Sequence, residues 1–327
     1  MMAFNYGLFR LPFVICCLLL PLTMQTLRRD SLLTPSTFDR ESLGCELNIE
    51  LKTASCENRG LNSVPQNLSI DILRFDLFRN NITSLLSWSF KRYPLITSLD
   101  LSQNDIRVIE QTALHPLKDL MYLDMSLNPH LVLPGTGLLR WARKLSTLNL
   151  QSSNLQSLPN DILKWSPRLE YVGLYRNHLK VVNVSSCGTS EHVTLSYNQI
   201  EHINADDFYF ACHGGYLNLQ GNPILSVDPD VVASLHVRTL FVGDYPVTFE
   251  SFRDLFSGIS HSEIKEIVII NASIVAFPDN FFDPLRDWPI NLLEFSYMYN
   301  KVNYLYPFVF LSLTKVYELS FGNDYIS

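Results

Sequence analysis

One short pattern of residues repeats along the chain at nearly constant spacing, and it constrains the fold more than any other feature of the sequence. Its clearest copy runs from Leu99 to Ile106 and reads L-D-L-S-Q-N-D-I, with alternating apolar residues followed by an asparagine and a further apolar residue. The asparagine position recurs in eleven copies from Asn80 to Asp324, at intervals of 21 to 28 residues. Such a period predicts a solenoid, in which each repeat is one coil stacked on its neighbours.

The residues within one repeat explain how a coil is built. Alternating apolar residues place one face of a short strand in a core that neighbouring coils share. The asparagine then turns the chain, and its buried amide has to bond backbone groups left open at the bend. Stacked coils should align these amides into a ladder. Its expected members are Asn80, Asn104, Asn128, Asn177, Asn198, Asn222 and Asn300, and other residues take the position at Ser153, Tyr245, Ala272 and Asp324.

A second apolar residue recurs ten positions after the asparagine. We expect these residues to form a spine that packs the convex side of the coils, because no single repeat can bury its apolar face alone. The spine residues are Phe90, Leu114, Leu138, Leu163, Phe208, Val232, Leu255, Phe282 and Phe310.

The repeat resembles that of leucine-rich-repeat proteins. The resemblance implies an α/β solenoid: a horseshoe with a parallel concave β-sheet, an irregular or short-helical convex side and a disulfide-stapled N-terminal cap. The expected organisation is a signal peptide over 1–26, a flexible leader over 27–44, the cysteine cap over 45–72 and about eleven repeats over 73–327, incomplete at the C-terminus.

The N-terminal segment is typical of a secretory signal. Arg10 precedes an apolar run from Leu11 to Leu22, which is shorter than a membrane-spanning helix requires. An uncleaved signal anchor is the alternative. No later apolar run reaches 18 residues, so we expect any membrane anchor to lie outside this chain. The expected location is the secretory pathway, on the extracellular or lumenal side of the plasma or endosomal membrane.

Four cysteines lie outside that segment, at Cys45, Cys56, Cys187 and Cys212. An even number in a secreted chain indicates two disulfides. The first pair suits a small cap, and the second pair should occupy nearly the same place on adjacent coils, within bridging distance. Two alternatives for the second pair are free buried thiols and a zinc site completed by His192 and His213.

Four N-x-S/T sequons without a central proline support the secretory route. They begin at Asn67, Asn81, Asn183 and Asn271, and we expect them to carry N-linked glycans.

Aromatic residues mark the face of the strands that should line the concave surface. Aromatic side chains suit an interface because they bury a large area with few rotatable bonds. The alternative is that tyrosine simply tolerates half-exposed strand positions. The candidate ligand contacts are Phe78, Tyr122, Tyr171, Tyr175, Tyr216 and Phe241.

Two sets of titratable residues also fall at equivalent positions of neighbouring repeats. Asp76, Asp100 and Asp124 should line up on three strands, where they could bind a cation or raise one another's pKa; the alternative is a solvated repeat consensus. His178, His192, His202 and His213 fall in three consecutive repeats. They could tune binding near pH 6, or they are ordinary surface histidines.

Composition and motifs exclude several functions. The formal net charge of −7 disfavours general nucleic-acid binding, although it leaves room for a local basic patch. The chain has no G-x-S-x-G, P-loop, H-E-x-x-H or G-x-G-x-x-G motif. We therefore expect a binding protein rather than an enzyme, with no cofactor and no metal.

The N-terminal cysteine cap indicates which kind of leucine-rich-repeat protein this chain resembles. Two cysteines with ten residues between them, followed by C-E-N-R-G-L-N-S-V-P-Q-N-L from Cys56 to Leu68, resemble the Toll-like receptor ectodomain, as do the 24-residue repeats. This resemblance implies a surface that binds microbial or endogenous ligands, often on a lateral face, and a receptor homo- or hetero-dimer. It also implies a membrane span and a signalling domain that these 327 residues do not contain, so we expect a fragment, a truncated gene model or an unusual isoform. The alternative is a secreted or matrix adhesion protein.

Overall fold

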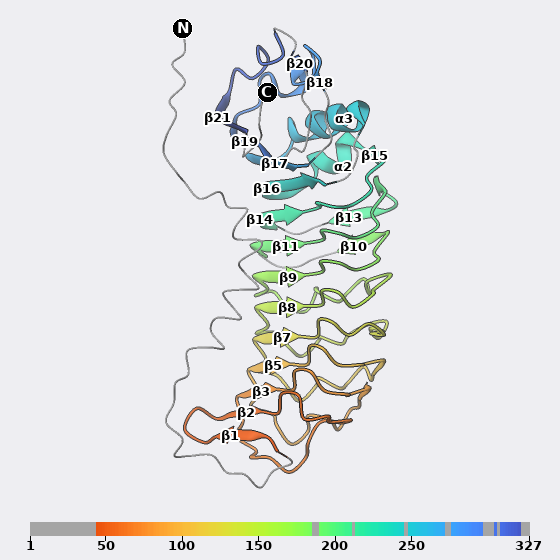
Figure 1. Ribbon diagram of the computed structural model, residues 1–327, viewed down its shortest axis with the longest axis vertical. Helices are drawn as coiled ribbons and strands as arrows, with labels where there is room; N and C mark the ends of the chain where they lie inside the picture. Colours follow the sequence, from red (N-terminus) through yellow and green to blue (C-terminus); the bar gives the residue numbers. More distant parts are fainter. Residues whose placement is uncertain are drawn as a thin grey trace. The chain divides into compact units, whose positions relative to one another are not determined.

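The coils stack along one continuous β-sheet (Figure 1). The computed structural model describes residues 44–184, 190–210, 213–244, 248–271, 276–296, 304–305 and 308–321, all within one compact unit, Asp39–Ser327. Among these residues the sheet has thirteen strands in the order β1-β2-β3-β5-β7-β8-β9-β11-β14-β16-β17-β19-β21.

The first two strands differ from the rest. β1 (Glu46–Asn48) and β2 (Thr53–Ser55) form an antiparallel hairpin, whereas β2 and all later neighbours pair in parallel. The later strands are β3 (Arg74–Asp76), β5 (Ser98–Asp100), β7 (Tyr122–Asp124), β8 (Thr147–Asn149), β9 (Tyr171–Gly173), β11 (His192–Thr194), β14 (His213–Asn218), β16 (His236–Gly243), β17 (Glu266–Ile270), β19 (Ile290–Ser296) and β21 (Val316–Phe321).

The register keeps the repeat in phase from coil to coil. Phe75 pairs with Leu99, Leu99 with Leu123, and Leu123 with Leu148, and all four side chains are at most 1 % exposed. Because side chains alternate between the two faces of a strand, this register places these four apolar side chains in the shared core. The leucine-rich-repeat fold with a parallel sheet is therefore confirmed.

The opposite side of the coils is mostly turns and short strands. The residues that the structure describes form four two-stranded parallel sheets there: β4 (Ser84–Leu85) with β6 (Val108–Ile109), β10 (Val182–Val184) with β13 (Phe208–Phe210), β12 (His202–Ile203) with β15 (Ser226–Val227), and β18 (Ala276–Phe277) with β20 (Tyr304–Leu305). Within the described ranges the helices come late, as α2 (Pro229–Ala233), α3 (Phe249–Ile259) and a 3₁₀ turn (Asp283–Leu285).

Helix α3 begins at a side-chain cap and presents one apolar face to the core. The backbone N–H of Ser251 donates to the Thr248 hydroxyl at 3.1 Å, which satisfies one of the open donors of the first turn. Phe252, Phe256 and Ile259 are at most 1 % exposed, and their spacing places them on one side of the helix.

The spine is buried as expected, with one exception. Its members from Phe90 to Phe282 are at most 4 % exposed, whereas Phe310 is 36 % exposed. In the last coils the spine widens into an aromatic cluster around Phe282. This residue lies 4.8 Å from Phe281, 5.8 Å from Phe277 and 5.9 Å from Phe295, measured between ring centroids.

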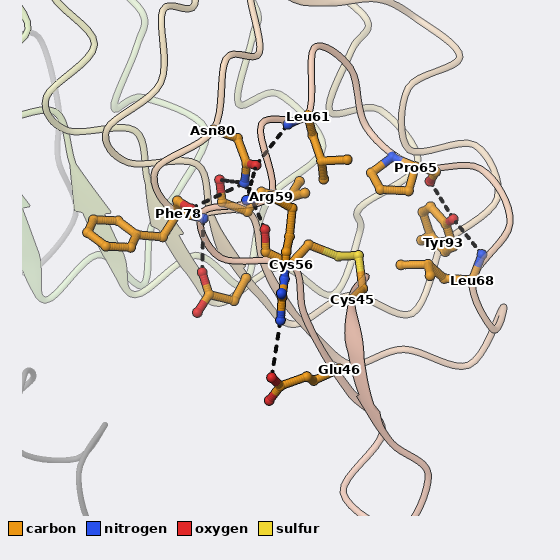
Figure 2. The surroundings of a disulfide bond; sticks show 12 residues. Cys45, Glu46, Cys56, Arg59, Leu61, Pro65, Leu68, Phe78, Asn80 and Tyr93 are labelled. Carbon is orange, nitrogen blue, oxygen red and sulfur yellow. Dashed lines mark hydrogen bonds and ion pairs between the residues drawn. A yellow bond between two sulfur atoms is a disulfide. The ribbon is translucent and has the colours of Figure 1, made fainter. Parts of the chain in front are cut away.

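The N-terminal cap closes the first edge of the sheet (Figure 2). Cys45 and Cys56 form the expected disulfide, and both are at most 3 % exposed. Figure 2 also shows the Tyr93 hydroxyl, which donates to the Pro65 carbonyl at 2.5 Å and ties the cap to the first coil. Burial raises the pKa of Tyr93, so the phenol stays neutral and keeps this hydrogen bond.

Candidate functional site

Each strand of the sheet leads into a turn of constant geometry. In nine successive turns the residue directly before the asparagine position has a positive φ, between 45° and 71°. These residues are Arg79, Gln103, Leu127, Ser152, Arg176, Tyr197, Gly221, Asp244 and Asn271. We call this row of turns the rim, since it follows the ends of the sheet strands.

The asparagines behind the rim hold successive coils together. The Asn104 amide donates to the carbonyls of Leu77 and Leu101 at 3.0 Å each, one on the preceding coil and one on its own. Its carbonyl oxygen accepts from Ile82 N at 3.0 Å. The same pattern recurs at Asn128, Asn177, Asn198 and Asn222.

The first member of the ladder bonds its own coil at Leu77 and bonds the cap where later members bond the preceding coil. The Asn80 amide donates to the Cys56 carbonyl at 2.9 Å, and its oxygen accepts from the backbone of Arg59 and Leu61 at 3.0 Å each (Figure 2). At Ser153 a hydroxyl takes the asparagine position and makes longer bonds, of 3.3 Å to Met125 O and 3.2 Å to Gln151 O. The turns at the rim are therefore fixed from behind, and their side chains are held in place.

Aromatic, cationic and acidic side chains gather on one stretch of the rim. We call Tyr175, Arg176, Tyr197, Gln220 and Asp244 the rim cluster. They come from the turns after β9, β11, β14 and β16, four neighbouring strands. Tyr197 is 37 % exposed, Arg176 is exposed, and the other three side chains are half-buried.

The rings and the guanidinium of the rim cluster stack on one another. Tyr175 and Tyr197 meet edge to face with centroids 5.4 Å apart. The Arg176 guanidinium lies 5.1 Å from the Tyr175 ring centroid and 5.9 Å from that of Tyr197. Such contacts restrict an otherwise mobile arginine, so its planar donor group is oriented before a ligand arrives.

A polar network joins Tyr197 to the next two coils. Its hydroxyl donates to an Asp244 carboxylate oxygen and accepts from Gln220 Nε2 at 3.2 Å. The other Asp244 oxygen accepts from Asn271 Nδ2 at 2.9 Å. Burial and then the hydrogen bond to Asp244 raise the pKa of Tyr197, so its hydroxyl remains a proton donor across the physiological range.

Gly221 provides the space in which the Tyr197 ring lies. A Cβ at this position would sit 2.7 Å from Tyr197 Cδ1, and the backbone φ of +71° also disfavours any larger residue. The sequence thus places a glycine where the ring crosses onto the next coil.

A shallow hollow of about 490 Å³ adjoins the rim cluster along the chain. Its lining includes His178, Lys180, Val181 and Gln199, and the first three follow directly after Arg176 and Asn177. The His178 ring nitrogen Nδ1 lies 2.8 Å from Gln199 Nε2. Two of the lining residues, His178 and Gln199, come two residues after the exposed Arg176 and Tyr197.

The six aromatic residues proposed from the sequence do not form one site. Phe78 and Tyr122 are half-buried and lie near the N-terminal cap, on coils separated from the other four by β8. Tyr171 and Tyr216 share one register position with His192, and the rings of His192 and Tyr216 are 4.3 Å apart. These residues belong to the concave face, whereas Tyr175 belongs to the rim cluster.

Phe241 departs from the expectation of an exposed concave residue. It is 3 % exposed and packs with Val268 and Ile270, while half-buried Tyr216 lies against this group. These three apolar residues lie at neighbouring concave positions on adjacent strands and bury one another. The alternation of residues along one strand does not show such contacts between strands.

The aligned aspartates serve the backbone. Oδ1 of Asp76, of Asp100 and of Asp124 each accepts from the N–H two residues further on, at 2.9 Å. Asp124 also accepts from Tyr122 Oη at 3.1 Å and from Asn149 Nδ2 at 3.0 Å. Burial and then the charge of Asp100 raise the pKa of Asp124. Within the described ranges, no group of three or more His, Cys, Asp or Glu residues could hold a metal ion.

Several expected residues have different surroundings or lie outside the described ranges. Cys187, Cys212 and Asn300 are outside them, so the second disulfide and its alternatives are not placed. Asn67 and Asn81 are exposed, Asn183 is half-buried, and the Asn271 amide is bonded to Asp244. The His202 ring bonds Ser226 Oγ at 2.9 Å, and His213 stacks on His236 at 4.5 Å.

Comparison with known proteins agrees with this fold. Residues 74–129 match the family model described as leucine rich repeat, which agrees with the repeat and the parallel sheet of the whole solenoid. Leucine-rich repeat-containing protein 3 of Danio rerio is 30 % identical over 116 residues, 35 % of this chain and 44 % of that protein. Fibromodulin of Sus scrofa is 28 % identical over 151 residues, 45 % of this chain and 99 % of that protein.

CD180 antigen of Mus musculus is 24 % identical over 236 residues, 70 % of this chain and 34 % of that protein. The chain thus spans less than half the length of this relative and of the one from Danio rerio.

In the part of the chain that the structure describes, no helix has the length and apolar character needed to cross a bilayer.

Proposed function

We propose that this chain is an extracellular leucine-rich-repeat recognition module that binds a protein ligand through the rim cluster. The observation that carries the proposal is the exposed stack of Tyr175, Arg176 and Tyr197, joined to Asp244 on a neighbouring coil. Tyrosine and arginine are the residues that most often dominate binding energy at protein interfaces. Here they are oriented by one another and by turns that the asparagine ladder fixes.

The arrangement suits binding better than catalysis. A protein ligand that contacts the rim cluster would meet a guanidinium donor, a phenol and two ring faces over four coils. The Tyr197 hydroxyl donates to the Asp244 carboxylate, so its proton is held within the rim cluster. Burial and this hydrogen bond raise the pKa of Tyr197 and keep the phenol protonated. The neighbouring hollow of about 490 Å³ offers a place for a ligand side chain beside His178.

Within this class we favour the ligand-sensing region of a Toll-like receptor. The residues from Cys56 to Leu68, and the disulfide that joins Cys45 to Cys56, support this choice. A second candidate is a secreted or matrix binding protein, which the similarity to fibromodulin over 151 residues favours. Reading the native transcript beyond Ser327 separates the two, because a membrane span and a Toll/interleukin-1 receptor domain are expected only for the first.

The rim cluster can be tested without knowing the ligand in advance. The chain, secreted from animal cells, is screened against an array of extracellular proteins, and each captured protein is measured by surface plasmon resonance. We expect Arg176→Ala and Tyr197→Ala to weaken the capture of the true ligand at least about tenfold, as for interface hot spots.

The repeat supplies a matched control. Arg79 occupies the same turn position as Arg176, is also exposed, and has a φ of 57° against 53°. Arg79→Ala should leave binding unchanged. If Arg79→Ala and Arg176→Ala weaken binding equally, or if neither does, the rim cluster is not the recognition site.

A further inference from the structure

Positive charge gathers on a second surface, formed by the segments that lead into β5, β7, β8 and β9. Lys91 and Arg92 lie in the first of these segments, Lys118 in the second, Arg140 and Arg143 in the third, and Lys164 and Arg168 in the fourth. We call these seven exposed residues the basic strip. With Lys144, the segments 87–96, 111–120, 135–144 and 160–169 hold eight cations against two carboxylates, a net +6 in a chain of net charge −7.

Contacts between coils show that these segments lie side by side. Lys144 Nζ bonds Asp119 Oδ1 on the preceding coil at 2.6 Å, and the rings of His115 and Trp141 are 4.6 Å apart. Adjacent strands of a sheet are about 4.8 Å apart, so the strip extends over roughly 15 to 20 Å. The residues of the basic strip come before each sheet strand in the sequence, whereas those of the rim cluster come after it.

The cations of the strip are largely without acidic partners. Among the described residues, Lys144 is the one cation of these segments that forms an ion pair. The second carboxylate of the region, Asp161, instead accepts from Gly137 N and from Trp165 Nε1, the latter at 3.1 Å. Unpaired positive charges in a row create a potential that an extended polyanion can satisfy.

Tryptophans hold the central arginine in place. The Arg140 guanidinium lies 5.6 Å from the ring centroid of Trp141 and 5.6 Å from that of Trp165 on the next coil. Lys164 Nζ is 5.4 Å from the Trp165 ring. A guanidinium held between two indoles loses less conformational freedom on binding, so its donor fork is prepared for a sulfate or phosphate.

The strip ends in a hollow that combines charge with apolar surface. The hollow measures about 760 Å³, and its lining combines Ile70, Trp88 and Leu95 with Lys91, Arg92 and one carboxylate, Asp71. Asp71 is paired with Lys52 at 3.8 Å. Trp88 is 52 % exposed and Ile70 is 60 % exposed, which is unusual for large apolar residues beside two cations. A flat ring with an apolar C–H face and anionic substituents fits such a surface.

We propose that the basic strip binds a sulfated glycosaminoglycan. The strip is linear and multivalent, like the repeating sulfates of such a polymer, and the exposed indole of Trp88 offers a face on which a pyranose ring can pack. The disulfide between Cys45 and Cys56 is typical of exported proteins, and the polyanion that such proteins meet outside cells is sulfated sugar rather than nucleic acid. The site is separate from the rim cluster and does not depend on the proposed protein ligand.

The test uses the secreted chain and a heparin octasaccharide, with binding measured by calorimetry at several salt concentrations. Replacing Arg140, Arg143 and Lys164 by glutamine should raise Kd at least tenfold. It should also reduce the dependence of log Kd on log salt, because binding through fewer ionic contacts releases fewer counterions. Trp88→Ala should raise Kd about threefold. Arg140→Lys, which keeps the charge and loses the planar stack, should lie between wild type and the triple variant.

The matched control removes the same charge elsewhere. Arg107, Arg238 and Arg286 are exposed and each pairs with a carboxylate, so their replacement by glutamine should change Kd less than twofold. Thermal unfolding of both triple variants establishes that they are folded. Equal weakening in the two triple variants would overturn the proposal, as would equal binding of desulfated heparin. Tighter binding of a single-stranded oligonucleotide than of the octasaccharide would overturn it in favour of a nucleic-acid site.

Discussion

From β3 to β11 every sheet strand has three residues, and the turn behind it is held by a buried asparagine or serine. From β16 to β21 the strands have five to eight residues, and phenylalanines fill the space behind them. In the early coils, asparagine side-chain amides form hydrogen bonds with the backbone N–H and C=O groups at the bend. The late coils extend the backbone pairing itself and rely on aromatic burial. The same coil geometry is thus stabilised by two different kinds of interaction.

The turn shows what the two regions share. Asp244 and Asn271 have φ values of 57° and 45°, like the residues that precede ladder asparagines, although the positions after them are Tyr245 and Ala272. The left-handed turn therefore does not require an asparagine behind it. It requires that the coils stay in register, which either set of contacts can ensure.

The largest expected effect is in the late coils. Phe282→Ala removes a fully buried ring that contacts five other phenylalanines, and should cost about 3 to 5 kcal/mol in the free energy of unfolding. Phe308→Ala, at a residue 60 % exposed, should cost less than about 0.5 kcal/mol. Urea unfolding gives the energies.

Hydrogen exchange then localises the change caused by Phe282→Ala. In a solenoid each coil contacts only its neighbours, so amides of β17 and β19 should lose protection while those of β5 and β7 keep it. Uniform loss of protection from β3 to β21 would show that the early and late coils unfold as one unit.

The next effect is in the early coils. Asn128→Ala leaves Ile106 N and the carbonyls of Leu101 and Met125 without their side-chain partner in a site that is 0 % exposed, and should cost about 3 kcal/mol. Asn128→Ser should cost less, because the hydroxyl of Ser153 already serves this position. Asn291→Ala, on an exposed residue of β19, is the control. Equal unfolding energies for the serine and alanine variants would mean that burial, and not hydrogen bonding, holds the ladder.

Removal of the cap disulfide should have a smaller effect that is confined to the first coils. The bridge between Cys45 and Cys56 spans 11 residues, so the double serine variant should lose about 2 to 3 kcal/mol. Hydrogen exchange should rise in β2 and β3 and fade toward β7. If protection changed equally in β19, the cap would be stabilising both regions rather than the ladder alone.

The smallest expected effect depends on pH. Burial lowers the pKa of His192, and its Nδ1 has no hydrogen-bond partner in the described structure. A histidine with a lowered folded-state pKa binds its proton more weakly when folded, so stability is complete above the ordinary pKa and falls as pH drops through about 6.5. His192→Phe keeps an aromatic ring beside Tyr216 and should reduce the fall in Tm between pH 7.5 and 5.5. An identical pH dependence in the variant would assign the effect to other groups.

The early coils could be predicted closely from the sequence, and the late coils less so. Asparagine spacing located β3 to β14, the ladder and the spine, because the side chain that bonds the turn is the one that marks the repeat. At Tyr245 and Ala272 the asparagine is replaced and the interval between repeats lengthens to 27 residues. Helix α3 lies in this interval and agrees with the expected short-helical convex side, but the sequence pattern did not locate it.

The candidate site shows a similar limit. Tyr175 was identified because it lies on the outward alternation of its strand, whereas Arg176 and Tyr197 lie one residue later, where the alternation ends. The signal that could have found them is their place directly before Asn177 and Asn198, repeated in every coil. Phe241 was misjudged because its burial depends on Val268 and Ile270 of the following strands.

The left-handed residues of the rim have a consequence for how such a surface can diversify. A non-glycine residue in this conformation costs about 1 kcal/mol, and glycine would remove that cost while also removing the side chain. Eight of the nine rim positions nevertheless carry a side chain, ranging from leucine and serine to arginine, tyrosine and aspartate. These turns accept the left-handed conformation with many different residues. Substitutions at single rim positions can therefore change which ligand binds while the fold is kept. A library randomised at these eight positions should yield folded proteins with altered partners.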